Sequence, residues 1–230
     1  MIISHTHRFI FIKTRKTAGT SVETYLSELC GSEDVFPKIY PAEQGHTPRN
    51  FAGLFNPIPD LLSSLGDSAL EATRPLRDLR ERRKFWNHMP ARYVRSRIGA
   101  KVWDSYYKFC FEREPMSKTR SHYQMMVREG KAADLNSYFE RGKFASDWHL
   151  YTDDAGKVIV DDVFRFETIN EDLGKVFDRL NIPFSGQLTT KTKVASDAPK
   201  PKAPFEPTDA QKDRLRDVFA SEIEAFGTTF

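Results

Sequence analysis

The sequence has few cysteines, a small net charge and few long apolar runs. Its 230 residues include two cysteines, Cys30 and Cys110, which are too far apart in the chain to indicate a disulfide framework or a zinc site. Thirty-five basic against thirty-two acidic residues leave a net charge of +3, too small to indicate nonspecific binding to nucleic acid. The apolar run near the N-terminus, Phe9 to Ile12, is too short for a signal peptide or a transmembrane segment. We therefore expect a cytoplasmic domain of enzyme size, with no metal and no nucleic-acid partner.

Aromatic residues are plentiful, and they predict a substantial core. The chain has 18 Phe, 8 Tyr and 3 Trp, with 39% apolar residues, a composition that excludes wholesale disorder. Apolar runs predict strands at 8–13, 106–111 and 158–166. Helical periodicity follows each of them, at 20–29, 117–128 and 173–180, and returns at 207–226. Strands that alternate with helices predict an α/β fold with a central, mostly parallel sheet and helices on both faces.

Residues 36–90 interrupt this alternation with an irregular, proline-rich excursion, in which one short helix is expected near 60–65. Within it, residues 74–84 hold six basic and two acidic side chains. We interpret this stretch as a solvated helix face, with contact to an acidic glycan as the alternative. Capping-box spacing predicts helix starts at Thr20 and at Thr168.

The segment Lys13 to Ser21, Lys-Thr-Arg-Lys-Thr-Ala-Gly-Thr-Ser, lies between the first predicted strand and helix. Helix N-termini bind anions, because free backbone N–H groups and the helix dipole point there. Gly19 allows a close backbone approach to a phosphate. The chain has no Gly-Lys-Ser/Thr tripeptide, so the Mg²⁺-binding hydroxyl and the lysine of a Walker A loop are missing. A phosphate loop and an ordinary capped turn are both open at this point.

The six residues Lys16 to Ser21, Lys-Thr-Ala-Gly-Thr-Ser, resemble the 5′-phosphosulfate loop of sulfotransferases that use 3′-phosphoadenosine 5′-phosphosulfate. That family has proline where this chain has Arg15, a departure that makes the start of the loop less rigid. The resemblance implies that Lys16 stabilises the bridging oxygen and the 5′-phosphate. The residues implied to cradle that phosphate are Thr17, Ala18, Gly19, Thr20 and Ser21.

A second segment resembles the 3′-phosphate motif of the same family. Phe109 to Pro115 reads Phe-Cys-Phe-Glu-Arg-Glu-Pro, and Ser121 follows Arg113 by the eight residues typical of that motif. An arginine at the carboxyl end of a strand can fork onto a phosphate, and Ser121 is expected to point back at the same group from the next helix. Met116 and Ser117 replace the family's aromatic–acidic pair, which is expected to affect packing more than phosphate binding.

The likeness to the bacterial carbohydrate-type members covers nearly the whole chain. It implies one sulfotransferase domain, 1–230, with a P-loop-like three-layer fold and with residues 36–90 on the substrate side. It also implies 3′-phosphoadenosine 5′-phosphosulfate as co-substrate, no metal, and a carbohydrate or glycolipid acceptor. Two other functions stay open: a P-loop-like kinase that uses ATP, and an inactive nucleotide-binding scaffold.

Sulfuryl transfer needs a base for the acceptor hydroxyl, and we predict His88. It precedes Arg113 by 25 residues, and a histidine before that strand is the usual base in the resembled family. An ordinary histidine pKa of about 6.5 suits the task. His46 is the main alternative, and a purely structural role for His88 is also open. The carboxylates that could substitute are Glu43, Asp60 and Glu112.

Overall fold

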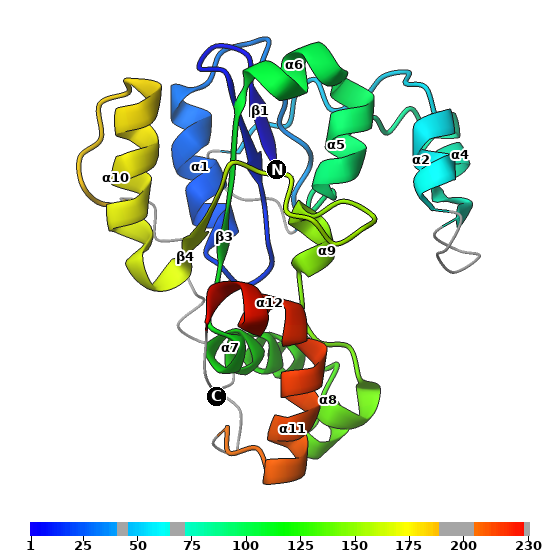
Figure 1. Ribbon diagram of the computed structural model, residues 1–230, viewed down its shortest axis with the longest axis vertical. Helices are drawn as coiled ribbons and strands as arrows, with labels where there is room; N and C mark the ends of the chain where they lie inside the picture. The colour runs from blue at the N-terminus through cyan, green and yellow to red at the C-terminus, as the bar shows by residue number, and fades with distance from the viewer. Residues whose placement is uncertain (41–45, 65–71, 189–204, 228–230) are drawn as a thin grey trace.

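A four-stranded sheet lies at the centre of the molecule, in the order β1-β2-β3-β4 (Figure 1). The computed structural model describes residues 1–40, 46–64, 72–188 and 205–227. The strands are β1 (Ile2–Ser4), β2 (Phe9–Ile12), β3 (Tyr107–Glu112) and β4 (Asp162–Arg165). β2, β3 and β4 pair in parallel, whereas β1 is antiparallel to β2. The predicted α/β class is confirmed, and the sheet is mixed, because the unpredicted strand β1 returns through a tight turn.

Helices cover both faces of the sheet, which explains why strands β1 to β3 are buried on both sides (Figure 1). Phe9 and Phe11 point to the face covered by α1 (Gly19–Leu29) and α10 (Ile169–Leu180). Ile10 and Ile12 point to the other face, which is covered by α5 (Ala91–Ile98), α6 (Ala100–Ser105) and α9 (Trp148–Tyr151). The alternation along β2 therefore separates two hydrophobic clusters.

A third cluster of helices lies beyond the carboxyl ends of the strands (Figure 1). It contains α7 (Pro115–Arg128), α8 (Leu135–Arg141), α11 (Asp209–Val218) and α12 (Ala220–Phe226), and its core includes Tyr138 and Leu215. The single helix predicted over 207–226 is two helices, because the chain turns at Phe219. Thr208 caps the first with a capping box to Gln211.

The described part of the excursion includes two short helices, α2 (Ile58–Ser63) and α4 (Arg74–Arg80), as the predicted short helix and the basic stretch suggested. The capping boxes at Thr20 and Thr168 are wrong. α1 begins after Ala18 with no side-chain cap, and the Thr168 hydroxyl donates to Asp172 instead, at 2.7 Å. A short 3₁₀ helix, η1 (Phe166–Thr168), precedes α10. None of the described helices has the length and apolar character needed to cross a membrane.

Candidate functional site

The turn from β2 into α1 presents an uncapped helix N-terminus. Lys16 and Ala18 adopt left-handed backbone conformations, with φ of 63° and 53°. Ala18 occupies the N-cap position without a side-chain hydrogen bond, and the first turn of α1 has no acidic residue. The first N–H groups of the helix therefore receive no capping oxygen from the N-cap side chain, which leaves them suited to an anion.

Gly19, which is predicted to allow a close backbone approach to a phosphate, also makes room for a side chain of the protein itself. A Cβ atom at this position would lie 2.7 Å from Cγ of Lys13. The buried Lys13 side chain passes over Gly19 to reach Oε2 of Glu23 at 2.6 Å and the Thr20 hydroxyl at 3.1 Å. Gly19 thus makes room for a lysine that crosses the start of the helix.

Glu23 holds two buried cations at the same place. Besides Lys13, it accepts a hydrogen bond from the Met1 ammonium at 2.5 Å. Burial alone would raise the pKa of Glu23, but the Met1 ammonium and Lys13 hold it below the ordinary value. The beginning of α1 is therefore fixed by ion pairs inside the protein.

The hydroxyls of the loop are largely engaged within the protein. The Thr17 hydroxyl is buried and lies 2.9 Å from that of Thr14, which in turn donates to the carbonyl of Phe111. The Thr20 hydroxyl accepts from Lys13. Ser21 is the remaining predicted hydroxyl donor, and it lies partly buried on the first turn of α1. The backbone N–H groups are thus the main anion donors that this loop offers.

Arg15, which stands where the resembled family has proline, is anchored rather than loose. Its backbone N–H and its Nε both donate to the Asp147 carboxylate, each at 2.6 Å. Asp147 is fully buried and also binds Lys118 at 2.8 Å, and Lys118 binds Glu112 at 2.5 Å. These four residues, Arg15, Asp147, Lys118 and Glu112, form a buried charge cluster that fixes the start of the loop. The expected loss of rigidity is therefore offset by this cluster.

The structure brings the second motif into direct contact with the first. Arg113, at the end of β3, donates from Nη1 to the carbonyl of Lys16 at 3.1 Å and from Nε to the Ser117 hydroxyl at 2.9 Å. Ser121 lies one helical turn beyond Ser117 on α7 and is partly buried. Sequence reasoning assigned Ser117 to packing, although its spacing of four residues from Arg113 was the signal for this contact.

Lys16 is a cation that no described residue neutralises directly. Its ammonium makes no hydrogen bond or ion pair within residues 1–40, 46–64, 72–188 and 205–227. Burial, followed by the nearby charges of Arg128 and Arg113, lowers the pKa of Lys16 to about 8. Cations that repel one another in a partly buried place favour the arrival of an anion.

His88 is joined to the same loop. Its Nδ1 lies 2.9 Å from the carbonyl oxygen of Lys13. A carbonyl can only accept, so Nδ1 carries the proton and Nε2 is the unprotonated nitrogen. Burial, then the charges of Lys13 and the N-terminus, lowers the pKa of His88 to about 4. The imidazole is therefore neutral at pH 7, in the tautomer that a base at Nε2 requires. It does not have the ordinary pKa expected from the sequence, and it is a weaker base than a histidine with that value.

His46 lies near the same lysine. Its ring packs edge-on against Phe36, with centroids 6.1 Å apart, and its buried Nε2 has no hydrogen-bond partner among the described residues. Burial lowers its pKa, and the charges of Glu23 and Lys13 also act on it. Both candidate histidines thus approach Lys13, but His88 is the one bonded to the loop. Glu43 lies outside the described residues.

The carboxylates considered as substitutes are already held by cations. Asp60 binds Arg97 at 2.7 Å and accepts from Ser96. Glu112 binds Lys118, and burial raises its pKa to about 7. Among the described contacts, neither carboxylate bonds to the backbone of the loop, as His88 does. No group of three His, Cys, Asp or Glu residues in the described part of the chain could hold a metal ion.

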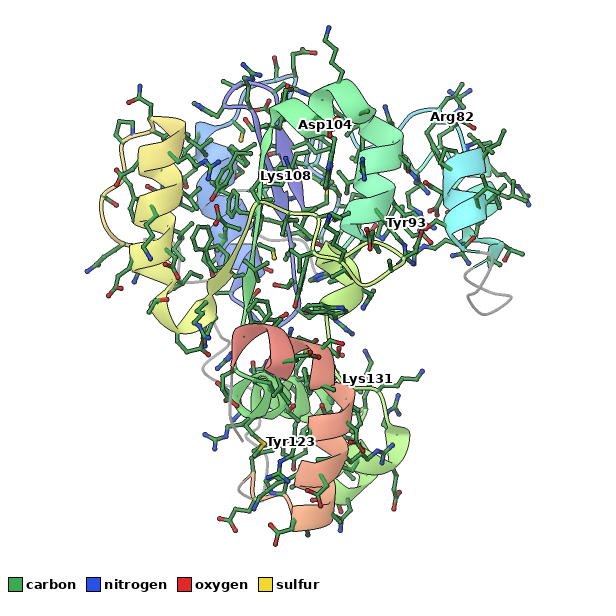
Figure 2. The ribbon with its side chains drawn as sticks, in the orientation of Figure 1. Arg82, Tyr93, Asp104, Lys108, Tyr123 and Lys131 are labelled. Atoms are coloured by element: carbon green, nitrogen blue, oxygen red, sulfur yellow. The ribbon has the colours of Figure 1, made fainter. Side chains whose placement is uncertain are left out.

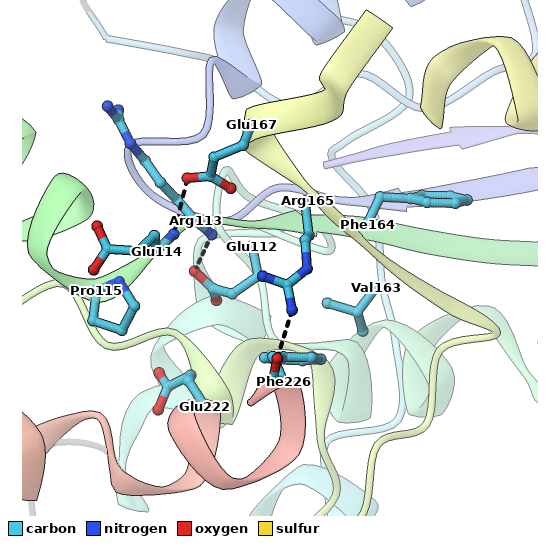
Figure 3. A pocket seen from close by; sticks show the side chains of 10 residues that line it. All are labelled: Glu112, Arg113, Glu114, Pro115, Val163, Phe164, Arg165, Glu167, Glu222 and Phe226. Carbon is cyan, nitrogen blue, oxygen red and sulfur yellow. Dashed lines mark hydrogen bonds between the residues drawn. The ribbon is translucent and has the colours of Figure 1, made fainter. Parts of the chain in front are cut away.

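A small pocket opens beside the second motif (Figure 3). Four of its lining side chains are acidic, which makes it unsuited to a phosphate: Glu112, Glu114, Glu167 and Glu222. The backbone N–H of Arg113 bonds to Glu112 there, while its guanidinium extends away from the other lining side chains (Figure 3). The candidate anion site is therefore on the Lys16 side of Arg113.

Comparison with known proteins finds a relative in an archaeon. The chain is 35% identical over 115 residues to an uncharacterized protein of Archaeoglobus fulgidus, an alignment that covers 47% of this chain and 94% of the archaeal protein. No protein-family model matches the chain, and no solved structure matches it.

Proposed function

The chain belongs to the same family as the Archaeoglobus fulgidus protein, and we propose that it is a sulfotransferase. It would move a sulfuryl group from 3′-phosphoadenosine 5′-phosphosulfate to a hydroxyl of a carbohydrate or glycolipid. The proposal includes a P-loop-like three-layer fold, in which β2, the loop and α1 take the place of the usual phosphate-binding unit. The free thiols Cys30 and Cys110 fit a reducing compartment, the cytoplasm.

One contact carries this proposal: the hydrogen bond from Arg113 to the carbonyl of Lys16. It joins two segments that are 97 residues apart in the chain and that resemble the two phosphate-binding motifs of one family. Coincidental matches would have no reason to meet. Their meeting beside the uncapped start of α1 supports a single site for a nucleotide with two separated phosphates.

Each residue has a physical task in this proposal. The N–H groups at the start of α1 and the Lys16 ammonium would bind the 5′-phosphosulfate, where charge develops on the leaving phosphate during transfer. Arg113 and Ser121 would bind the 3′-phosphate. Nε2 of His88 would accept the proton of the acceptor hydroxyl. The nucleotide, when bound, supplies the sulfuryl group.

Isothermal titration calorimetry with adenosine 3′,5′-bisphosphate, AMP and ATP tests the proposal. Losing one charge-assisted phosphate contact costs about 1.5–3 kcal/mol, so the bisphosphate should bind at least tenfold more tightly than AMP. Equal affinity for the two would remove the assigned role of Arg113 and Ser121.

The same titrations, together with an activity assay, distinguish two alternatives. ATP binding that requires Mg²⁺, or activity abolished by EDTA and restored by Mg²⁺, would identify a kinase instead. Tight bisphosphate binding without turnover on any carbohydrate or glycolipid acceptor would identify a nucleotide-binding scaffold. The anchoring of Arg15 by Asp147 argues against degeneration of the loop.

A further inference from the structure

The lobe formed by α2 and α4 carries its charges inside. The guanidinium of Arg97, on α5, binds Asp60 of α2 at 2.7 Å and Asp78 of α4 at 3.3 Å. All three side chains are buried. This ion triad holds the two helices side by side at the edge of the molecule, beyond α5 (Figure 1).

The outer faces of the same helices carry exposed aliphatic side chains. Ile58 and Leu62 each lie two residues from Asp60, which is about 200° of rotation around the helix, so they point away from the buried triad. Their exposed fractions are 60% and 64%. On α4, Leu76 and Arg80 have the same relation to Asp78, and Leu76 is 53% exposed. The usual polarity of a surface helix is therefore reversed on α2, whereas α4 exposes a leucine beside arginines.

The exposed apolar residues are concentrated here. Five large hydrophobic side chains in the described part of the chain are strongly exposed, and four of them belong to this lobe: Leu54, Ile58, Leu62 and Leu76. Leu54 lies beside Arg82, because the N–H of neighbouring Gly53 donates to the Arg82 carbonyl at 2.8 Å. We call these four residues the aliphatic patch.

Positive charge accompanies the aliphatic patch. Arg77, Arg80 and Arg82 are exposed and form no ion pair with any residue that the structure describes; Figure 2 labels Arg82 on this lobe. The two acidic residues of the same stretch are engaged elsewhere, because Asp78 is buried and Glu81 lies 3.5 Å from Arg83. The outer surface is thus both aliphatic and cationic.

We propose that this lobe docks the protein on an anionic lipid surface. Aliphatic side chains on surface helices insert into the boundary between headgroups and acyl chains, and arginines bind lipid phosphates. Protein-binding hot spots favour Trp and Tyr, whereas the four residues of the aliphatic patch include no aromatic side chain. Lipid binding by this lobe does not depend on the proposed sulfotransferase activity.

Vesicle co-sedimentation of the full chain tests this surface. Wild-type protein should bind vesicles that contain phosphatidylserine, should bind much less to pure phosphatidylcholine, and should be released by salt. Ile58→Ser with Leu62→Ser should weaken binding roughly tenfold or more. Arg77→Gln with Arg80→Gln should weaken it roughly 25-fold, at about fivefold per charge.

Matched controls lie on other parts of the surface. Tyr40→Ser removes the remaining strongly exposed hydrophobic side chain, and Arg141→Gln removes an exposed charge on α8; neither should change binding. Circular dichroism should show all variants folded, because the substituted side chains are exposed. Wild-type protein that stays in the supernatant, or patch variants that bind as well as wild type, would overturn the proposal. A patch-dependent dimer in analytical ultracentrifugation would also overturn it, because a second copy would then cover the surface.

Discussion

The two anion motifs meet at one carbonyl group, yet they are held in different ways. In the loop, Lys13 is bound to Glu23, Arg15 to Asp147 and Thr17 to Thr14, which fixes the backbone around the Lys16 ammonium. In the second motif, Arg113 is partly buried and donates from Nη1 to the carbonyl of Lys16 and from Nε to Ser117, which leaves the N–H groups of Nη2 for a phosphate. The loop is fixed by buried ion pairs, whereas the guanidinium of the second motif is held by two neutral acceptors. We therefore expect loop variants to affect turnover and second-motif variants to affect affinity.

The largest effect is expected at the histidine attached to the loop. His88→Ala should lower turnover by roughly 10²–10⁴-fold and leave binding of adenosine 3′,5′-bisphosphate nearly unchanged, because the imidazole acts on the acceptor. His46→Ala is the matched control and should have a much smaller effect. Steady-state sulfation kinetics and calorimetry measure both. A larger effect from His46→Ala would transfer the role of base to that residue.

Lys16→Ala and Arg113→Ala separate the two motifs. Lys16→Ala should lower kcat more than nucleotide affinity, since charge on the leaving phosphate grows in the transition state. Arg113→Ala should weaken nucleotide binding by about 1.5–3 kcal/mol. Single-turnover kinetics with calorimetry measure the two quantities. Full turnover of Lys16→Ala, or the same changes in kcat and nucleotide affinity for both variants, would contradict this division of roles between the two motifs.

Gly19→Ala tests the rigidity of the loop. The new Cβ would lie 2.7 Å from the Lys13 side chain, which is pinned at its far end by Glu23, so we expect about 1–3 kcal/mol lower stability. Gly174→Ala is the matched control, because a Cβ there meets no atom within 4 Å and alanine favours the helix. Urea denaturation compares them. Equal stability of the two variants would show that Lys13 moves aside freely.

The pH profile of kcat/KM gives the smallest of these effects. His88 must be neutral, so activity should fall as pH drops through about 4, and not through the ordinary histidine value near 6.5. Lys16 must be protonated, so activity should fall as pH rises through about 8. Lys16→Arg should move only the alkaline limb upward. An acidic limb near 6.5 would contradict the burial of His88.

Local pattern was enough to predict much of the fold, whereas the pairing of the two motifs in one site was implied by the family resemblance. The strand and helix around the loop follow from apolar spacing, and the last helical region begins at Thr208, where the periodicity over 207–226 predicts it. β1 was missed because three residues carry too little pattern. The left-handed conformations of Lys16 and Ala18 were not predicted, since the loop is held by tertiary contacts of Lys13 and Arg113.

The features of the site that the sequence could not predict depend on contacts between residues far apart in the chain. Lys118, in the middle of an amphipathic helix, gives no local sign that it meets Asp147 and Glu112. The bond from His88 to the Lys13 carbonyl spans 75 residues, and it sets the tautomer. Ser117 was undervalued because the family pattern, and not the helical spacing from Arg113, guided its interpretation.

The buried charge cluster also bears on the order of events in folding. Its four members come from the loop, from β3, from α7 and from the segment before α9. An ionised side chain buried without its partners is strongly unfavourable, so the cluster cannot form one member at a time. We expect the third helical cluster to join the sheet in a single late step, visible in pulse-labelled hydrogen exchange as simultaneous protection of β3 and α7. The arrival of Asp147 would then be the event that completes the loop, and the protein would have no structured anion site before its last folding step.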